Sequence, residues 1–324
     1  MDTGTLLLAL TGLAMLGVGG DVMVRGAVGI AQRLRVSPMF TGLVLVGFGT
    51  STPELVTSLS AALKGSPGIA VGNVLGSNIA NTLLILGLTA IVLPIPADRR
   101  SFQRDAPMLA IATLACVGFA LLGSMGRLVG GVFLLLLSAY LVYTYRMESR
   151  GRDAPAELHA LQGALLHVPY RKAGTSVVLA AGGLAGVLVG AHLLVQSSID
   201  IARSLGIPET VIGLTIVAVG TSLPELATSM AAVFKRQTDI ALGNIIGSNI
   251  FNILGILGLT ALVAPFTIPH SLLVYDIWVL LGVTGLLLTF ALTTAHITRG
   301  EGVVFLLLYA AYLAFLTARA VGWA

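Results

Sequence analysis

The sequence GTSTPELVTS at residues 49–58 returns as GTSLPELATS at residues 220–229, and GNVLGSNIAN at 72–81 returns as GNIIGSNIFN at 243–252. These stretches belong to one longer repeat, because residues 42–90 and 213–261 align without a gap and are identical at 29 of 49 positions. Such internal similarity indicates that one structural unit occurs twice. Each copy carries one glutamate within an apolar stretch, Glu54 in the first and Glu225 in the second.

The composition around the repeats is that of an integral membrane protein. Of the 324 residues, 56% are hydrophobic and 10% are charged, and the mean hydropathy is +0.97, far above a soluble domain. Apolar runs long enough to cross a bilayer as helix recur along the chain, without the alternation of an outer-membrane barrel. The first run, residues 5–19, lacks a basic start and a clear cleavage site, so we interpret it as a span and not a signal peptide. We therefore expect an all-α integral membrane protein.

The apolar runs predict ten transmembrane helices in two halves. The expected spans are 4–24, 40–63, 69–93, 105–123, 128–146, 174–199, 211–234, 240–263, 271–293 and 301–320. The first five-helix repeat is expected over 1–146, the second over 174–324, and a charged linker loop over 147–173 joins them. Since five is odd, the second repeat would lie inverted in the membrane relative to the first, as in many secondary transporters.

Basic residues predict the orientation of these spans. With the N-terminus outside, fourteen of the eighteen lysines and arginines fall on the inner side and four on the outer side. The four outer residues are Lys64, Arg127, Arg203 and Arg319. Because cytoplasmic loops are enriched in Lys and Arg, we expect both termini outside, the linker in the cytoplasm and the protein in the cell (inner) membrane.

Hydroxyl side chains surround each glutamate at helical spacing. They are Thr50, Ser51, Thr57 and Ser58 in the first copy, and Thr221, Ser222, Thr228 and Ser229 in the second. Pro53 and Pro224 lack an N–H and free backbone carbonyls one turn earlier. Because Ca²⁺ binds about six to eight oxygen ligands, and a lone carboxylate in hydrocarbon is costly, this pattern predicts an intramembrane cation site.

A second polar stripe follows in each copy. Asn73, Ser77 and Asn81, and then Asn244, Ser248 and Asn252, are spaced by four residues. We expect Ser77, Asn81, Ser248 and Asn252 to be ligands, whereas Asn73, Asn78, Asn244 and Asn249 could equally be hydrogen-bonding contacts between helices. Five charged residues near span ends are expected to be solvated at the membrane interface and are left out of the site: Asp21, Arg25, Asp200, Glu209 and Asp276.

The repeated motifs resemble the two alpha-repeats of the calcium/cation antiporter superfamily, of the prokaryotic sodium/calcium exchanger type. The resemblance implies a core of eight short helices crossed by two long tilted ones, spans one and six, and alternating access in which Na⁺ entry expels Ca²⁺. It implies that the carboxylates of Glu54 and Glu225 bind Ca²⁺ and that Na⁺ uses the same carboxylates. It further implies that Thr50 and Thr221 give backbone carbonyls, and that Ser51, Ser77, Ser222 and Ser248 complete sodium sites.

One residue departs from part of that family. Some sodium/calcium exchangers and the potassium-dependent branch carry aspartate where this chain has Asn252, which matches Asn81 in the first half. Two carboxylates balance one Ca²⁺ or two Na⁺, so three Na⁺ would leave an excess positive charge, and potassium dependence is not expected. A Ca²⁺/H⁺ antiporter on the same fold stays open, because each glutamate could take a proton when the cation leaves.

Other classes of protein fit the pattern less well. A cation channel usually has a pore that is symmetric by oligomerisation, not two related sites in one chain. Neither a nucleophile beside a base nor a cofactor motif accompanies the glutamates, so we expect neither an enzyme nor a cofactor. No nucleic-acid patch is visible in the sequence. The expected partners are Ca²⁺, Na⁺ and the lipid bilayer, with the chain functional as a monomer.

Overall fold

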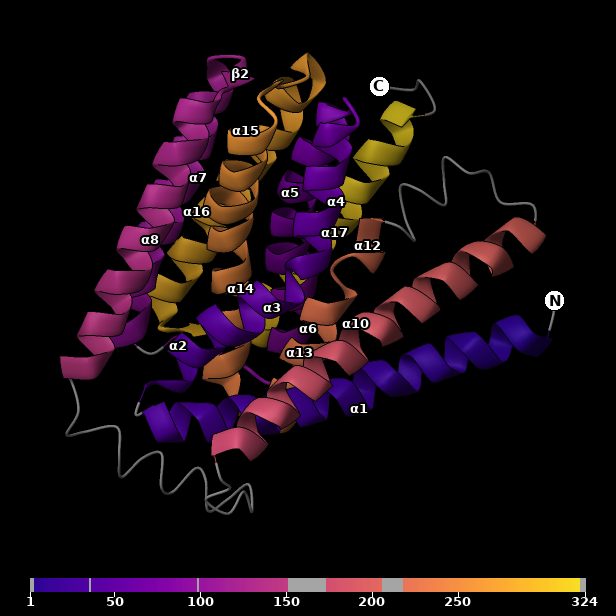
Figure 1. Ribbon diagram of the computed structural model, residues 1–324, viewed down its shortest axis with the longest axis vertical. Helices are drawn as coiled ribbons and strands as arrows, with labels where there is room; N and C mark the ends of the chain where they lie inside the picture. The colour runs from indigo at the N-terminus through magenta and orange to yellow at the C-terminus, as the bar shows by residue number, and fades with distance from the viewer. Residues whose placement is uncertain (1–2, 35, 98, 151–172, 206–217, 321–324) are drawn as a thin grey trace.

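The computed structural model describes residues 3–34, 36–97, 99–150, 173–205 and 218–320, which form a bundle of membrane-spanning helices (Figure 1). Helices are the expected form, because a helix satisfies all of its backbone polar groups internally and lipid offers no hydrogen bonds. In the first half the elements are α1 (Thr3–Leu34), α2 (Pro38–Thr41), η1 (Gly42–Gly47), α3 (Phe48–Thr50), α4 (Thr52–Leu63), α5 (Pro67–Ala80), η2 (Asn81–Leu86), α6 (Gly87–Val92), β1 (Ile95–Pro96), α7 (Arg99–Leu121), β2 (Ser124–Met125) and α8 (Arg127–Arg150).

The second half follows the same order. Its elements are α10 (Ala173–Ser204), α12 (Ala218–Gly220), α13 (Leu223–Phe234), α14 (Thr238–Ile250), η4 (Phe251–Leu257), α15 (Gly258–Val263), β3 (Phe266–Thr267), η5 (Leu272–Asp276), α16 (Ile277–Thr294), β4 (His296–Ile297) and α17 (Arg299–Ala320). Elements labelled η are π-helical turns, which are rare and are found mostly as single-turn bulges, often at functional sites.

Among the described residues, eight helices are long and apolar enough to cross a membrane, and the bent pair Pro38–Thr50 and Thr52–Leu63 would be a ninth. The remaining expected span, 211–234, begins in residues outside the described part of the chain, and its described portion contains the short apolar helix α13. The chain is therefore a multi-pass helical membrane protein, and the tenth span stays a prediction.

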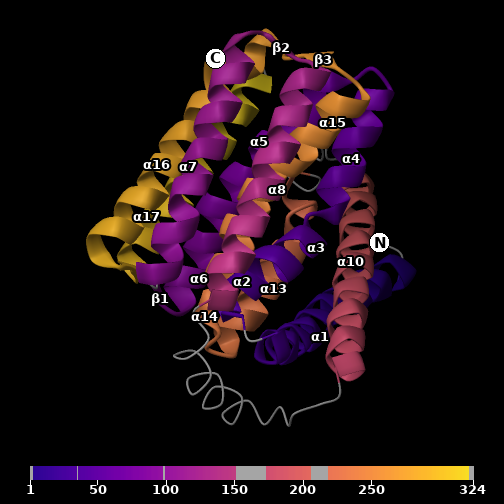
Figure 2. The same cartoon turned by 60° about the vertical axis from the view of Figure 1, so that its left-hand side comes forward.

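Helix α1 and helix α10 form a separate layer that crosses one end of the bundle at a steep tilt (Figures 1 and 2). Each has 32 residues, more than any other described helix, and the two run antiparallel. Glycines let their backbones touch: a Cβ built on Gly183 would lie 2.3 Å from the backbone nitrogen of Met23, and one built on Gly26 would lie 2.3 Å from that of Ala180. Close contact between small residues is a common means of joining helices in membranes.

The main hydrophobic core lies outside this layer. It joins α5 to α8 and α14 to α17 through buried residues such as Leu75, Phe133, Ile253 and Phe305, and it includes no residue of α1 or α10. The α1–α10 layer packs instead on two smaller clusters, one of which brings Met23 against α13 and α14. The layer is therefore attached to the bundle by less apolar packing than holds the bundle together.

Two short strand pairs join the halves of the chain. Strand β1 of the first half pairs with β4 of the second, and β2 of the first pairs with β3 of the second, both antiparallel. Strand β1 holds the same place in the first repeat as β3 in the second, and β2 the same place as β4. Exchanging the two halves therefore turns one pair into the other. The pairs close the loops at the ends of the bundle, where backbone groups leave the helices and need partners.

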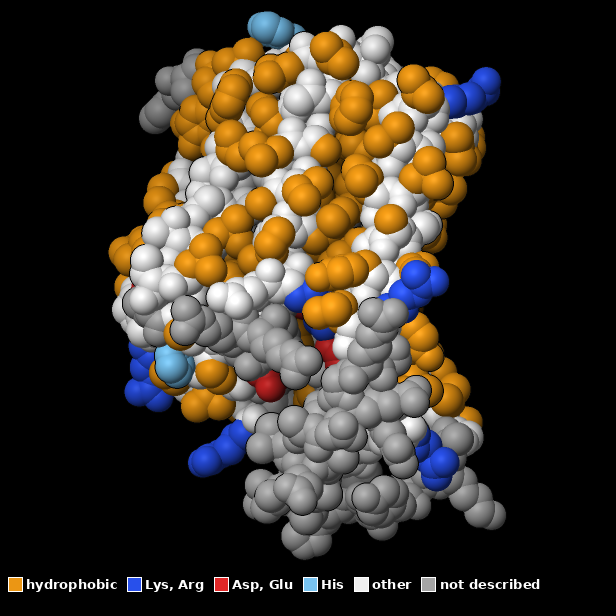
Figure 3. All heavy atoms as spheres, turned by 90° about the vertical axis from the view of Figure 1, so that its left-hand side faces the viewer, with side chains coloured by type: hydrophobic (Ala, Val, Ile, Leu, Met, Phe, Trp, Pro, Cys, Tyr) orange, Lys and Arg blue, Asp and Glu red, His pale blue; other side chains and the backbone are white. Residues whose placement is uncertain are grey.

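The outer surface of the bundle suits a lipid environment. Large apolar side chains cover the face formed by α7 and α8, with charged groups gathered towards its ends (Figure 3). Leu128 is 83% exposed and Leu135 is 71% exposed on this face. Apolar exposure on this scale marks a membrane-facing surface.

Candidate cation site

The two glutamates occupy equivalent places at helix breaks. Glu54 lies in the first turn of α4 and Glu225 in the first turn of α13, and each helix begins beside a proline after a serine that does not have helical backbone angles. The first break bends the span by 44°. Glu54 is 0% exposed and Glu225 1% exposed. A helix N-terminus favours negative charge, which partly offsets the cost of holding these carboxylates away from water.

One hydrogen bond joins the two copies directly at this site. Ser51 Oγ donates to Glu225 Oε1 at 2.9 Å. Thr50 lies beside it with its hydroxyl 3.0 Å from the Val46 carbonyl oxygen and 3.3 Å from Asn244 Oδ1. Glu54 follows Ser51 in the chain and lies in the first turn of the helix that Ser51 caps. The structure therefore places both glutamates in one buried centre, to which each repeat contributes residues.

Unpartnered oxygen atoms are concentrated here. In the described part of the chain, eight buried side-chain polar atoms have no hydrogen-bond partner, and all eight are oxygens. Six belong to residues predicted as ligands: both carboxylate oxygens of Glu54, Oε2 of Glu225, Oγ of Ser222 and the amide oxygens of Asn81 and Asn252. Buried polar groups are nearly always paired, so oxygens gathered here without protein partners suit a cation as their partner.

Asparagines explain why the two amide oxygens are free. Asn81 donates through Nδ2 to Asn249 Oδ1 at 3.2 Å, and Asn252 donates to Asn78 Oδ1 at 3.0 Å. Asn249 in turn donates to Thr82 Oγ1 at 2.9 Å. The bond from Asn81 to Asn249 and the bond from Asn252 to Asn78 are the same contact with the two halves exchanged. Each uses the amide nitrogen of Asn81 or Asn252 and leaves its oxygen available as a ligand.

A second asparagine in each copy holds the glutamate backbone. Asn73 Nδ2 lies 3.2 Å from the Glu54 carbonyl oxygen and 2.9 Å from Ser58 Oγ. Asn244 Nδ2 lies 3.2 Å from the Glu225 carbonyl oxygen and 2.8 Å from Ser229 Oγ. The side-chain amides of Asn73, Asn78, Asn244 and Asn249 thus make contacts between helices, which favours the second of the two roles that the sequence left open.

The other predicted ligands lie at the same centre to different degrees. Ser248 is fully buried and its hydroxyl donates to the Gly47 carbonyl oxygen at 3.2 Å. Ser77 is 4% exposed on the equivalent turn of α5, and Thr221 is half-buried just before Ser222. The hydroxyl of Thr50 is committed to protein acceptors, which is compatible with a role for its backbone carbonyl rather than its side chain.

The donor set fits a hard cation. Carboxylate, amide and hydroxyl oxygens from both copies meet in a buried centre with a formal charge of minus two when both glutamates are ionised. Oxygen-only sets suit Ca²⁺ and Na⁺, whereas soft metals prefer sulfur and imidazole. No cluster of three or more His, Cys, Asp or Glu side chains occurs among the described residues. The centre thus depends on neutral oxygens to complete its coordination.

A buried charged network elsewhere was not predicted from the sequence. Arg104 pairs with Asp105 at 2.7 Å and with Glu148, and Glu148 accepts hydrogen bonds from the backbone and side chain of Ser37 at 2.8 and 2.7 Å. Tyr140 donates to Asp105 at 2.7 Å. The network fixes the start of α2 to α7 and α8. The signal available in the sequence was the presence of opposite charges near the ends of expected spans.

The interpretation of Asp276 as an interfacially solvated residue is wrong. Asp276 is 4% exposed. It accepts a hydrogen bond from Tyr312 at 2.8 Å and lies 3.7 Å from Arg319. Asp276 holds the same place in the second half as Asp105 in the first, and Asp105 likewise accepts a hydrogen bond from a tyrosine, Tyr140. Asp21 and Arg25 are 40% and 53% exposed, as expected for an interface, and Glu209 lies outside the described residues.

Comparison with known proteins agrees with this geometry. Residues 4–146 and 175–318 match the family model described as sodium/calcium exchanger protein. The chain is 39% identical to the putative antiporter CaxA of Alkalimonas amylolytica over 94% of this chain and 95% of that protein. It is 35% identical to the sodium/calcium exchanger MaX1 of Methanosarcina acetivorans over 98% and 99%.

Solved structures give the same result. The sodium-calcium exchanger NCX_Mj, soaked with Na⁺ and Ca²⁺, superposes with a TM-score of 0.80 at 36% identity and covers 97% of this chain and 99% of its own. The same exchanger soaked with Na⁺ and Sr²⁺ gives 0.82 at 34% identity. The resemblance predicted from the repeated motifs is confirmed: the chain belongs to the sodium/calcium exchanger protein family.

Proposed function

We propose that this protein is a secondary active antiporter that exchanges Ca²⁺ for Na⁺ by alternating access. The observation that carries the proposal is the group of buried, unpartnered oxygens of Glu54, Glu225, Asn81, Asn252 and Ser222, contributed by both copies of the repeat. Two ionised carboxylates balance one Ca²⁺ or two Na⁺, so the two ions can replace each other at one centre without leaving excess charge. Membership of the exchanger family supports the same substrates.

The two halves are proposed to be five-helix repeats of opposite orientation. Contacts related by exchange of the halves support this: Asn81 to Asn249 with Asn252 to Asn78, and strands β1–β4 with β2–β3. An inverted pair of repeats can adopt two conformations in which the halves exchange roles, so that the centre opens to one side of the membrane and then to the other.

The packing of the α1–α10 layer supports one such conformation. Helix α1 packs along α13, whereas α10 and α4, the pair at the equivalent positions, show no comparable packing in the described chain. The bond from Ser51 to Glu225 has the same asymmetry, because Ser222 Oγ and Glu54 lack partners in the described chain. Both observations fit a transporter in one of two facing states.

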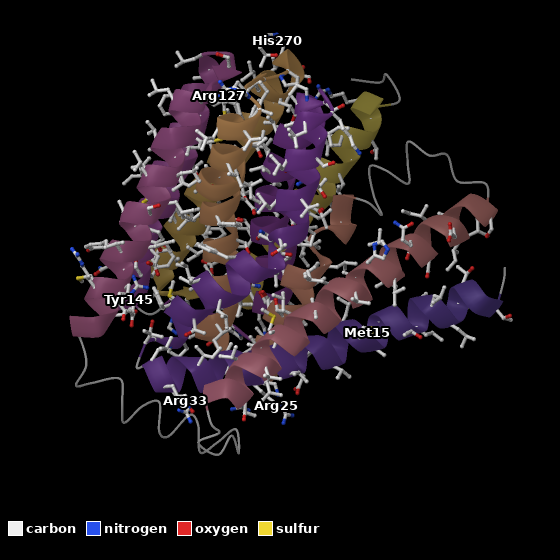
Figure 4. The ribbon with its side chains drawn as sticks, in the orientation of Figure 1. Met15, Arg25, Arg33, Arg127, Tyr145 and His270 are labelled. Carbon is white, nitrogen blue, oxygen red and sulfur yellow. The ribbon has the colours of Figure 1, made fainter. Side chains whose placement is uncertain are left out.

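We further propose that the protein lies in the cell (inner) membrane with both termini outside and works as a monomer. Figure 4 places Arg127 at the opposite end of the molecule from Arg25 and Arg33, in agreement with the distribution of basic residues that predicts the orientation. An Escherichia coli relative that is 36% identical over 80% of this chain is named an inner membrane protein.

The test is flux of ⁴⁵Ca²⁺ into proteoliposomes loaded with Na⁺ and diluted into Na⁺-free buffer. Matched vesicles carry only an outward proton gradient. Uptake that depends on the Na⁺ gradient is the expected result. Uptake driven by protons alone would replace the proposal with a Ca²⁺/H⁺ antiporter, a candidate that the two-carboxylate centre with Asn252 also suits. Current without a counter-ion would identify a channel, and absence of flux in both vesicles would remove Ca²⁺ as the substrate.

A further inference from the structure

An ion pair connects the α1–α10 layer to the helix that carries Glu225. The Lys235 ammonium, at the C-terminal end of α13, contacts Asp21 Oδ1 of α1. The other carboxylate oxygen, Oδ2, is 2.7 Å from Nε of Arg25, one turn along α1. Lys235 is 14% exposed and Asp21 40% exposed, so the pair is partly shielded from water.

This pair lies across the boundary between the two layers. One turn of α13 from Lys235, Ala231 contacts α1, and a Cβ built on Gly20 would lie 3.0 Å from the Ala227 carbonyl oxygen and 3.3 Å from Ala231 Cβ. The apolar packing here is the smaller cluster around Met23 and Val233, apart from the main core. The ion pair is therefore a charged contact at a boundary that has a smaller apolar core than the bundle itself.

The equivalent positions in the other half cannot form this contact. The repeat offset of 171 residues relates Asp21 to His192 on α10, and Lys235 to Lys64 at the end of α4. The same offset relates Gly12 to Gly183 and Gly19 to Gly190, which shows that it holds along these helices. A histidine and a lysine cannot form an ion pair, because neither side chain carries a negative charge. Exchange of the two halves would therefore bring together residues that do not attract.

We propose that Asp21 and Lys235 form a charge latch that favours the facing state seen here over its mirror state. The inference rests on the proposed alternating access. With α1 seated on α13 the latch is closed. In the mirror state α10 seats on α4, α1 leaves α13, and no ion pair replaces the one that is lost. Under the proposed topology Lys235 lies on the cytoplasmic side, so the latch favours the outward-facing state.

The latch is expected to be modest in strength. Partly exposed ion pairs contribute little, so removing this one should change the ratio of the two states about two- to fivefold. A shift of this size biases the transporter without trapping it, since each cycle must break the pair. Raising ionic strength with choline chloride, which carries neither transported ion, should weaken the latch in the unmodified protein.

The populations can be measured by double electron–electron resonance in a Cys116→Ser background. Spin labels at Leu10→Cys on α1 and Phe234→Cys on α13 report the separation of the two layers, and both positions are exposed. Asp21→Asn and Lys235→Gln should each increase the longer-distance population about two- to fivefold, and the double variant should do no more than either one.

Arg25→Gln is the matched control. It removes the same charge as Lys235→Gln from the same carboxylate, but within α1, so it leaves the boundary contact in place. Its distance distribution should stay close to that of the parent. A shift as large as that of Lys235→Gln would show that general charge, and not the contact between layers, sets the population, and would overturn the proposal.

His192→Asp provides the opposite test. It places a carboxylate opposite Lys64 in the mirror state, and should raise the population of that state about two- to fivefold while Asp21 and Lys235 remain intact. Unchanged distances in Asp21→Asn, Lys235→Gln and His192→Asp would refute the latch even if Na⁺-driven Ca²⁺ uptake is present. Absence of that uptake would refute the exchange proposal instead, because the distance measurement needs no transport.

Discussion

Ser51 donates a 2.9 Å hydrogen bond to Glu225, whereas Ser222 makes no equivalent bond to Glu54 in the described structure. The two residues belong to different copies of the repeat, so the contact joins the halves at the centre of the molecule. A nearly symmetric sequence thus forms an asymmetric centre, in which one carboxylate has a protein donor and the oxygens of the other have none in the described chain.

Glu54→Gln and Glu225→Gln should each abolish Ca²⁺ transport and leave a folded protein. The amide keeps the shape of the side chain but removes half of the negative charge that balances the cation, and losing one partner of a buried charge pair lowers affinity by about two orders of magnitude or more. Flux of ⁴⁵Ca²⁺ in proteoliposomes measures the loss, and gel filtration checks the fold. Exchange at normal rates in either variant would remove the glutamates from the site.

Asn252→Asp should change the ion stoichiometry or the pH dependence of exchange. The new carboxylate replaces an amide whose oxygen is buried and unpartnered, so it adds a titratable charge to a centre that has two. The flux ratio of Na⁺ to Ca²⁺ between pH 6 and 9 is the measurement. Asn81→Asp is the matched variant in the other half, and unaltered ratio and pH profile in both would place these residues outside the centre.

Gly183→Leu should destabilise the protein, because its side chain would meet the backbone of Met23 at 2.3 Å. Overpacking of this kind costs about 1–3 kcal/mol. The matched control is Gly182→Leu, the neighbouring residue, which has nothing within 4 Å of its Cβ position among the described residues. Thermal unfolding in detergent compares the two, and equal melting temperatures would contradict the close packing of α1 on α10.

Glu148→Gln should lower stability more than Arg319→Gln. Glu148 accepts from Ser37 and Arg104 with 9% side-chain exposure, so its loss weakens a buried network and costs about 1–3 kcal/mol. Arg319 is 28% exposed and lies 3.7 Å from Asp276, so the second change should cost less than about 1 kcal/mol. Thermal unfolding in detergent measures the two losses of stability. A larger loss for Arg319→Gln than for Glu148→Gln would show that the network does not stabilise the start of α2.

The repeat made most of the centre predictable. Glu54 and Glu225 were predicted because a carboxylate in an apolar span needs a partner and because the two copies agree, and the structure shows that both are buried. Asn81 and Asn252 were predicted from spacing along one helix face, and their role as ligands stays a prediction. The sequence left the second set of asparagines open, since an amide gives the same pattern whether it binds an ion or a neighbouring helix. Only the contacts to the Glu54 and Glu225 carbonyls separate the roles.

Other features depend on tertiary contacts and could not be found from local patterns. Asp276 lies near a span end, where most charges are solvated, and only the position of Tyr312 shows that it is buried. The π-helical turns that begin at Asn81 and Phe251 were not among the features expected from the sequence. Lys235 directly follows the expected span 211–234, and nothing in its local sequence indicates that α1 crosses close enough to pair with it.

The glycine contacts between α1 and α10 have a consequence for leakage. Because Gly12, Gly19 and Gly26 of α1 face Gly190, Gly183 and Ala180 of α10 along the helices, neither helix can shift sideways without colliding with the other's backbone. In an exchanger that alternates as proposed, the two helices would then move together as a single rigid piece. A movement that uncovers the centre on one side of the membrane would cover it on the other, so ions would find no continuous path down their gradients.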